Sequence, residues 1–307
     1  MTRHWFDRRW RLAAVAAVLL VAGCASTQPA EPAAQAGSVP GQGPHHHGAR
    51  GHGGHAAQGH GGHRHGGHGS VHAAVIGDGR SLSAAGHTLA GLTLAGSRLS
   101  FRVENPAGKP LTDFATTHTK RLHMFVFATD LTDFRHVHPE MGPAGRWEIN
   151  LPSLSAGSHR VVAEFRPRGR QSSILLGGAV EAPGQRPARP LPPPDTEVRV
   201  DGYAVTLAAD QVAGGRTLLQ VKVTDSTGGP VALRPYLGSW AHAVLVHSGT
   251  FAVTHLHPLE VVDGHASSPS ALTLDAPPVE PGNYRLFVEF ATADGNHQAG
   301  FTIPATR

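Results

Sequence analysis

The sequence predicts an all-β protein that contains two tandem β-sandwiches of immunoglobulin-like or cupredoxin-like kind. Three observations predict this fold class. The 307 residues are long enough for two ordinary domains. Val, Leu, Thr and Phe alternate with polar residues in short runs bounded by Gly, Pro, Asn or Asp, and long helical patterns are absent. One histidine motif also occurs twice in the same spacing.

In this motif a histidine is followed, after twelve residues, by His-x-His-Pro. The two copies are His123, His136, His138 and Pro139, then His242, His255, His257 and Pro258. Each position of the second copy lies 119 residues after its counterpart. A second repeat is the similarity between residues 159–165 (HRVVAEF) and residues 284–290 (YRLFVEF). An ungapped four-point match indicates a duplicated domain.

The predicted sandwiches span residues 75–181 and 196–307, joined by a proline-rich, semi-rigid linker at 182–195. Strands of the first are expected at 88–94, 98–103, 122–128, 134–138, 147–151, 159–165 and 174–180. Strands of the second are expected at 198–200, 203–207, 218–223, 242–246, 251–255, 271–274, 284–290 and 299–303. Short strands at this spacing are typical of sandwiches.

The N-terminus is expected to be a lipoprotein signal peptide over residues 1–23. Four arginines precede the apolar run 12–22, which is shorter than the roughly 20 residues that a spanning helix needs. The run stops before Cys24, in an arrangement that resembles a bacterial lipobox, with an ordinary signal peptide as the alternative. We therefore expect a lipid anchor at Cys24 in the bacterial envelope, on the outer membrane if the cell has two membranes and on the cell surface if it has one. The export route, Sec or Tat, stays open.

Residues 24–74 are expected to form a disordered, Gly- and His-rich tether, because they lack hydrophobic periodicity. Ten histidines lie in it: His45, His46, His47, His52, His55, His60, His63, His65, His68 and His72. Histidine-rich tracts are typical of loose metal binding, and imidazole suits zinc, copper and nickel. The alternative is a low-complexity linker without a metal-binding role.

Composition excludes several classes of function. The net charge is +4, and the excess of arginine in residues 1–23 accounts for three of these charges, so no basic face predicts nucleic-acid binding. Cys24 is the only cysteine, which excludes an internal disulfide and a blue-copper site in the folded part. Histidine (23) outnumbers Asp plus Glu (22), which is the clearest anomaly in the composition.

A hairpin that turns at Thr129 and Asp130 would place His123 directly across from His136 and diagonal to His138. The same reasoning pairs His242 with His255, near His257. Three imidazoles on one face could converge on an ion at about 2.0–2.1 Å and leave the fourth position open. The alternative is that these histidines are structural.

Around these residues the chain resembles a family of uncharacterised, exported, two-domain bacterial proteins with the repeated motif. The resemblance rests on residues 130–140 (DLTDFRHVHPE), 235–238 (PYLG) and 255–258 (HLHP), and covers most of residues 85–303. It implies an envelope protein loosely associated with heavy-metal or copper handling. The chain departs from the family at residues 248–250, where SGT replaces an acidic turn.

We expect a lipid-anchored protein that buffers or delivers copper or zinc outside the cytoplasm, with a delivery partner that the sequence does not identify. Metal binding should weaken as the pH falls through about 6.5, where histidine protonates. One alternative is a surface adhesion or sensor module with structural histidines. A metal-dependent hydrolase with Glu140 or Glu260 as base is the second, but no nucleophile motif is present, and we do not expect an enzyme.

Overall fold

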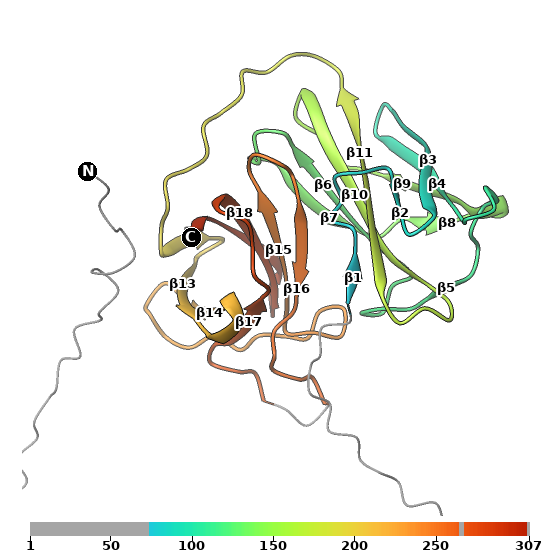
Figure 1. Cartoon of the computed structure of the whole chain (residues 1–307). Helices are drawn as coiled ribbons and strands as arrows, with labels where there is room; N and C mark the ends of the chain where they lie inside the picture. The colour runs from blue at the N-terminus through green and yellow to red at the C-terminus, as the bar shows by residue number, and fades with distance from the viewer. Residues whose placement is uncertain (1–73, 264–266, 306–307) are drawn as a thin grey trace, which may run out of the picture. The chain divides into compact units, whose positions relative to one another are not determined.

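A computed structural model describes residues 74–263 and 267–305. The regular secondary structure of the described chain is almost entirely β-strand, as the sequence predicts (Figure 1). Two 3₁₀ turns, η1 (Pro143–Gly145) and η2 (Ala213–Gly215), are the helical elements of the described residues. None of these residues forms a helix long and apolar enough to cross a membrane.

Strands β1 to β11 form two sheets that enclose one hydrophobic core. The six-stranded sheet has the order β1-β11-β10-β6-β7 with β5 beside β10, and its strands are β1 (Val75–Ile76), β5 (Phe114–Ala115), β6 (Leu122–Ala128), β7 (Phe134–Val137), β10 (Gly157–Pro167) and β11 (Ser173–Ala182). The five-stranded sheet is β2 (Ser83–Ala84), β3 (His87–Ala95), β4 (Arg98–Glu104), β9 (Arg146–Asn150) and β8 (Glu140–Met141). We call this pair of sheets sandwich 1.

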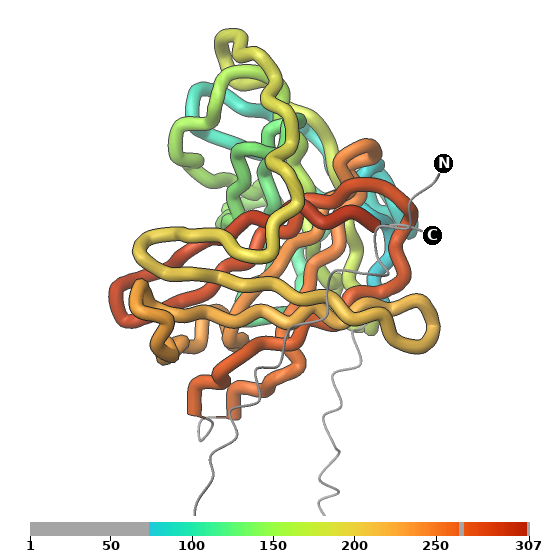
Figure 2. Tube along the Cα trace, turned by 90° about the vertical axis from the view of Figure 1, so that its left-hand side faces the viewer, coloured from blue at the N-terminus to red at the C-terminus, as the bar shows by residue number. Residues whose placement is uncertain are grey.

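Strands β12 to β19 form two four-stranded sheets around a second core, which we call sandwich 2. One sheet is β12 (Glu197–Val200), β13 (Tyr203–Gln211), β14 (Thr217–Thr224) and β17 (Leu272–Ala276). The other is β16 (Val253–Leu256), β15 (Ala241–His247), β18 (Gly282–Thr292) and β19 (Gly295–Ala305). Strands β18 and β19 pair over their full length in the hairpin drawn in red in Figure 2.

Every predicted strand corresponds to an observed one, with small differences at the ends. The prediction omitted four strands of two residues each, namely β1, β2, β5 and β8. Such short strands carry too little alternation to be recognised from sequence. Residues 183–196, between β11 and β12, contain no strand.

The two central strands that carry the first histidine of each motif are buried along their whole length. In β6, Met124 and Val126 face the core of sandwich 1, while Phe125 and Phe127 belong to a separate apolar cluster. That cluster also contains Val244 of β15, so it joins the two sandwiches. Because side chains alternate along a strand, the second face of β6 is directed towards sandwich 2.

The predicted register of the histidine hairpins is wrong by two residues. In sandwich 1 Phe125, not His123, pairs with His136, and in sandwich 2 Val244 pairs with His255. The turn has four residues between Ala128 and Asp133 instead of two, with Leu131 at φ 57°. Asp130 stabilises this longer turn, because its carboxylate accepts hydrogen bonds from the backbone and hydroxyl of Thr132. A shift of two preserves the face, so the histidines still lie on one side.

Candidate metal centre

The strand pattern directs the histidines of both motifs to the region between the two sandwiches. His123 alternates with Met124 along β6 and therefore shares the outward face with Phe125. His242 occupies the same place on β15. His123 and His242 are 1% and 0% exposed, so each imidazole needs hydrogen-bond partners inside the protein.

In sandwich 1 two motif histidines lie within hydrogen-bonding distance of one nitrogen of the third. His123 Nδ1 is 3.0 Å from His136 Nε2 and 3.2 Å from His138 Nε2. On the other side of the ring, His123 Nε2 donates to the carbonyl oxygen of Thr117 at 3.0 Å. His136 Nδ1 donates to the carboxylate of Glu289 at 2.7 Å, and Glu289 belongs to sandwich 2.

Sandwich 2 repeats this arrangement. His242 Nδ1 is 3.3 Å from His255 Nε2 and 3.1 Å from His257 Nε2. His242 Nε2 donates to the carbonyl oxygen of Tyr236 at 3.1 Å. His255 Nδ1 donates to the carboxylate of Glu164 at 2.8 Å, and Glu164 belongs to sandwich 1. Each sandwich therefore supplies the carboxylate that accepts a hydrogen bond from a motif histidine of the other sandwich.

These partners fix which ring nitrogens carry protons. A carbonyl oxygen can only accept, so the Nε2 atoms of His123 and His242 must be protonated, and their Nδ1 atoms keep a lone pair in the neutral ring. Two imidazole nitrogens approach the lone pair of each of these Nδ1 atoms. Because a lone pair accepts one hydrogen bond, only one of the two nitrogens can donate to it. A metal ion would use all these lone pairs at once. Hydrogen bonding of the other ring nitrogen to a carbonyl or carboxylate is the usual environment of a metal-binding histidine.

The distances between the inward nitrogens also suit a metal. Three nitrogens at about 2.0–2.1 Å from a tetrahedral ion are about 3.3 Å apart. The four nitrogen–nitrogen distances are 3.0, 3.2, 3.3 and 3.1 Å. The three histidines of the sandwich 2 motif could therefore hold an ion with little movement of the rings, whereas in sandwich 1 the compact set has His255 in place of His138.

Burial holds these rings neutral. It is the main reason that the pKa of His123 falls to about 3, that of His138 to about 3 and that of His242 to about 2, and repulsion from neighbouring His136 adds to each effect. Burial also places the pKa of His255 well below 6.5. Protons should therefore compete with a metal at lower pH than the ordinary histidine value of about 6.5 suggests.

The six motif histidines form one continuous cluster and not two separate triads. Ligand atoms within 4.8 Å of one another come from His123, His136 and His255 in one set, and from His242, His255 and His257 in the other. His255 belongs to both sets, and the first set contains histidines of both sandwiches. His138 is close to His123 but is replaced by His255 in the compact set of three.

Sequence reasoning missed three parts of this site. The carbonyls of Thr117 and Tyr236 left no side-chain signal, although they lie 119 residues apart like the motifs. Glu164 and Glu289 did leave a signal in the sequence, because each is the only acidic residue in one of the two similar segments, 159–165 and 284–290. His118 was not among the predicted site residues. It adopts φ 46° in a turn and stacks on His257 at a centroid distance of 3.6 Å.

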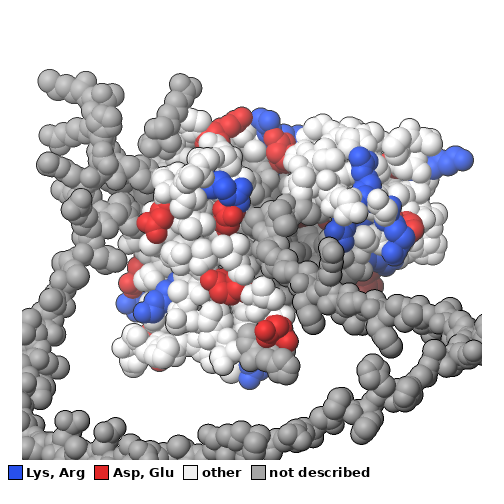
Figure 3. Space-filling view, turned by 60° about the horizontal axis from the view of Figure 1, so that its bottom comes forward, with Lys and Arg blue, Asp and Glu red and all other residues white. Residues whose placement is uncertain are grey.

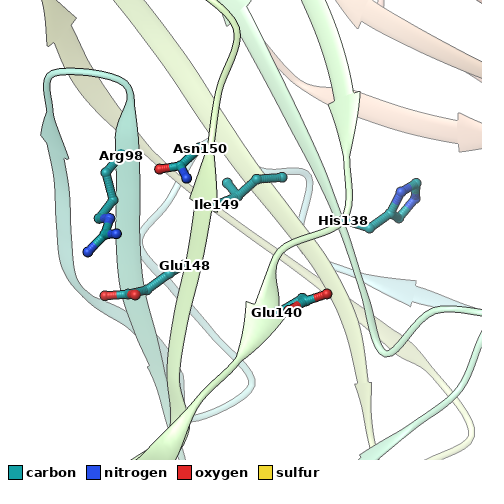
Figure 4. A pocket seen from close by; sticks show the side chains of 6 residues that line it. All are labelled: Arg98, His138, Glu140, Glu148, Ile149 and Asn150. Atoms are coloured by element: carbon teal, nitrogen blue, oxygen red, sulfur yellow. The ribbon is translucent and has the colours of Figure 1, made fainter.

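Two hollows reach the cluster from its outer histidines. A cleft of about 580 Å³ is lined by His255, His257 and Glu164, and also by Ala74, the first described residue. A smaller pocket of about 340 Å³ is lined by His138 and Glu140, with Glu140 pointing to the side of His138 in Figure 4. The rest of its lining is Arg98, Glu148, Ile149 and Asn150.

The remaining buried histidines have partners of their own. His159 donates through Nδ1 to the carbonyl oxygen of Gly157. His297 is bonded to Asp201 and Thr292 at a hairpin end. On the face shown in Figure 3, several Lys and Arg side chains gather on the right-hand part of the molecule, and positive and negative side chains are interspersed on the left-hand part. The signal peptide, Cys24, the tether and its ten histidines lie outside the described residues.

A family model described as a domain of unknown function (DUF8832) matches residues 77–176 and 197–307. The chain belongs to this family. The two matched segments agree with the predicted resemblance to an uncharacterised two-part family, but the family model carries no association with metals. No curated protein sequence matches the chain.

Solved structures that match are remote in sequence. The FN1–FN3 domains of chicken CNTN1 are 11% identical with a TM-score of 0.20, over 76% of this chain and 66% of that one. Red sea bream transglutaminase is 14% identical with a TM-score of 0.21, over 72% of this chain and 31% of that one. Parabacteroides merdae β-glucuronidase is 11% identical with a TM-score of 0.20, over 71% and 24%. The chain thus spans between a quarter and two-thirds of these proteins, and the likeness is too weak to bear on function.

Proposed function

We propose that this protein binds copper or zinc through its buried histidine cluster and acts outside the cytoplasm as a metal buffer or delivery protein. The observation that carries the proposal is the protonation pattern of His123 and His242. Their outward nitrogens donate to carbonyl oxygens, so their inward nitrogens present lone pairs to the other histidines. A bound cation would satisfy all these buried, convergent lone pairs at once, which supports the proposal.

The proposed location follows from the N-terminal sequence. A signal peptide over residues 1–23 and lipidation of Cys24 would tether the protein to the envelope membrane. The histidines of the tether would collect ions loosely. Ala74 lines the cleft that leads to His255 and His257, so the end of the tether at residue 74 adjoins the proposed entrance for the ion.

We propose binding and not catalysis as the role of the cluster. Of the two carboxylates considered as bases, Glu260 accepts hydrogen bonds from the backbone nitrogen of Thr273 at 2.9 and 3.1 Å. Glu140 is exposed in β8 and reaches only the pocket beside His138. A hydrolase would need a metal ion with an open coordination position next to a carboxylate that is free to act as a base. Glu140 and Glu260 have different environments, so the two motifs do not have such a base in common.

The proposal is tested with the full-length chain in which the ten tether histidines are replaced by serine. In that background we expect binding of Zn(II) and Cu(II) that survives competition from a weak chelator, measured by equilibrium dialysis. A further His136→Ala, His255→Ala double substitution should abolish it. The matched control is His297→Ala, which removes a buried histidine outside the cluster and should leave binding unchanged. Failure of the background protein to bind either metal would refute the proposal.

A further inference from the structure

Four of the six rings are arranged as the corners of a tetrahedron. The ring centroids of His123, His136, His242 and His255 are between 5.2 and 6.1 Å apart in all six pairs. Four imidazoles bound tetrahedrally to one ion at about 2.0–2.1 Å have centroids roughly 5 Å apart. The four rings, two from each sandwich, therefore surround one point at about this spacing. Ligand nitrogens of His123, His136 and His255 already lie within 4.8 Å of one another, and that of His242, which is in such a set with His255, has to approach the other two to complete the shell.

The same four histidines have the environment of ligands. Each has its outer nitrogen bound to an acceptor, either the carbonyl of Thr117 or Tyr236 or the carboxylate of Glu164 or Glu289. They are also the most enclosed, because His136 and His255 have side chains that are 0% and 3% exposed. His138 and His257 are half-buried and line the smaller and the larger hollow, and His255 lines the larger one as well.

Charge balance favours one divalent ion over two. Burial raises the pKa of Glu164 to about 7, so Glu164 and Glu289 together supply at most two negative charges, which offset one dication in the low-dielectric space between the sandwiches. A second dication would add two uncompensated positive charges. The nearby Lys120, which repels positive charge on His123 and His138, would increase that excess.

We infer that the protein has one tetrahedral site for a divalent ion, shared by the two sandwiches, with His123, His136, His242 and His255 as its ligands. This inference rests on the proposed function and gives it a stoichiometry, a geometry and a metal class. A site closed by four protein ligands is typical of tightly held zinc, whereas Cu(II) favours tetragonal geometry. His138 and His257, at 3.2 and 3.1 Å from ligand nitrogens, lie on the entry side and pass the ion inward.

The test measures how many ions bind per chain in the full-length variant whose ten tether histidines are replaced by serine. The variant is titrated with Zn(II), and with Co(II) as a spectroscopic probe. We expect one ion per chain and the intense visible absorption of four-coordinate Co(II). His123→Ala and His242→Ala should each weaken binding by more than about 100-fold, beyond the range typical of partners of the ligands. His297→Ala, which removes a buried histidine outside the cluster, is the matched control and should leave affinity unchanged.

Independent triads predict a different result. They would bind two ions per chain, and His123→Ala would leave the ion of sandwich 2 in place. Either outcome overturns the shared site while leaving metal binding itself intact, so the two proposals fail separately. The weak spectrum of six-coordinate Co(II) would also overturn it. Because the spectrum and the ion count need no substitution in the cluster, unfolding of a variant cannot obscure them.

Discussion

At the scale of single residues, the protonation of the cluster is set by backbone oxygens. Thr117 and Tyr236 differ in side chain, yet each carbonyl accepts from the equivalent histidine. The same backbone turn surrounds both, since Thr117 bonds with Lys120 and Tyr236 with Ser239. Substitution of either side chain should therefore matter less than a change in the turn.

Burial of neutral imidazoles makes the metal-free protein sensitive to acid. The pKa values of His123 and His138 are lowered to about 3 and that of His242 to about 2, whereas the unfolded chain has values near 6.5. Below pH 6.5 the unfolded state binds more protons than the folded state. The free energy of unfolding therefore decreases as the pH is lowered from 6.5 towards the pKa values of the folded state. Each histidine can contribute up to about 1.4 kcal/mol per pH unit.

We therefore expect urea unfolding in the presence of a chelator to require less urea at pH 5.5 than at pH 7.5. The variant His138→Gln should show a shallower dependence, because it removes one of the titrating groups without altering the most buried rings. An unfolding free energy that is constant between these two pH values would contradict the assignment of neutral, buried histidines.

At the scale of elements, β6 and β15 are each buried on both faces and serve two cores at once. Their inward residues fill a sandwich, and their outward residues fill the apolar cluster between sandwiches. In this cluster Phe134 of β7 stacks on Phe287 of β18 at a centroid distance of 4.2 Å. The histidines and this apolar contact share one interface, so packing and ligand geometry should be coupled.

Phe134→Ala should destabilise the protein by about 3–5 kcal/mol and also lower its metal affinity. Phe101→Ala is the matched control, because Phe101 is equally buried but belongs to the core of sandwich 1 alone. It should destabilise the protein comparably and leave affinity nearly unchanged. Chelator competition at a temperature where both variants are folded measures the difference. Equal affinities in the two variants would show that the interface does not control the site.

At the scale of the whole molecule, the exchanged carboxylates make each sandwich part of the other's site. His136 depends on Glu289, and His255 depends on Glu164. A ligand that binds only the folded state stabilises it by about 2.7 kcal/mol at a concentration 100 times its dissociation constant. Here that stabilisation should be distributed over both sandwiches.

The fluorescence of two buried tryptophans can report the stability of each sandwich separately, because Trp147 lies in the core of sandwich 1 and Trp240 in the core of sandwich 2. We expect Zn(II) to shift the urea transition of both tryptophans to higher denaturant and to a common midpoint. Trp147→Phe and Trp240→Phe variants assign the fluorescence signals. A metal that shifts the transition of one tryptophan alone would indicate a site confined to one sandwich.

The sequence predicted the all-β fold and the strands through local alternation, which each segment carries by itself. It also placed His123 and His136 on one face, because a two-residue error in register does not change the face of a strand. The hairpin register itself was wrong, since the longer turn depends on Asp130 and on a left-handed Leu131.

What the sequence alone determined about this protein was therefore periodic and repeated: strands, duplication and two matched sets of histidines. Only the tertiary structure decided that the two sets meet, that His255 joins both, and that each set takes its carboxylate from the opposite sandwich. The physical reason is that periodicity specifies the face of a strand but not what packs on that face. Contacts between residues more than ninety positions apart, such as His255 with Glu164, arise from the packing of whole sheets.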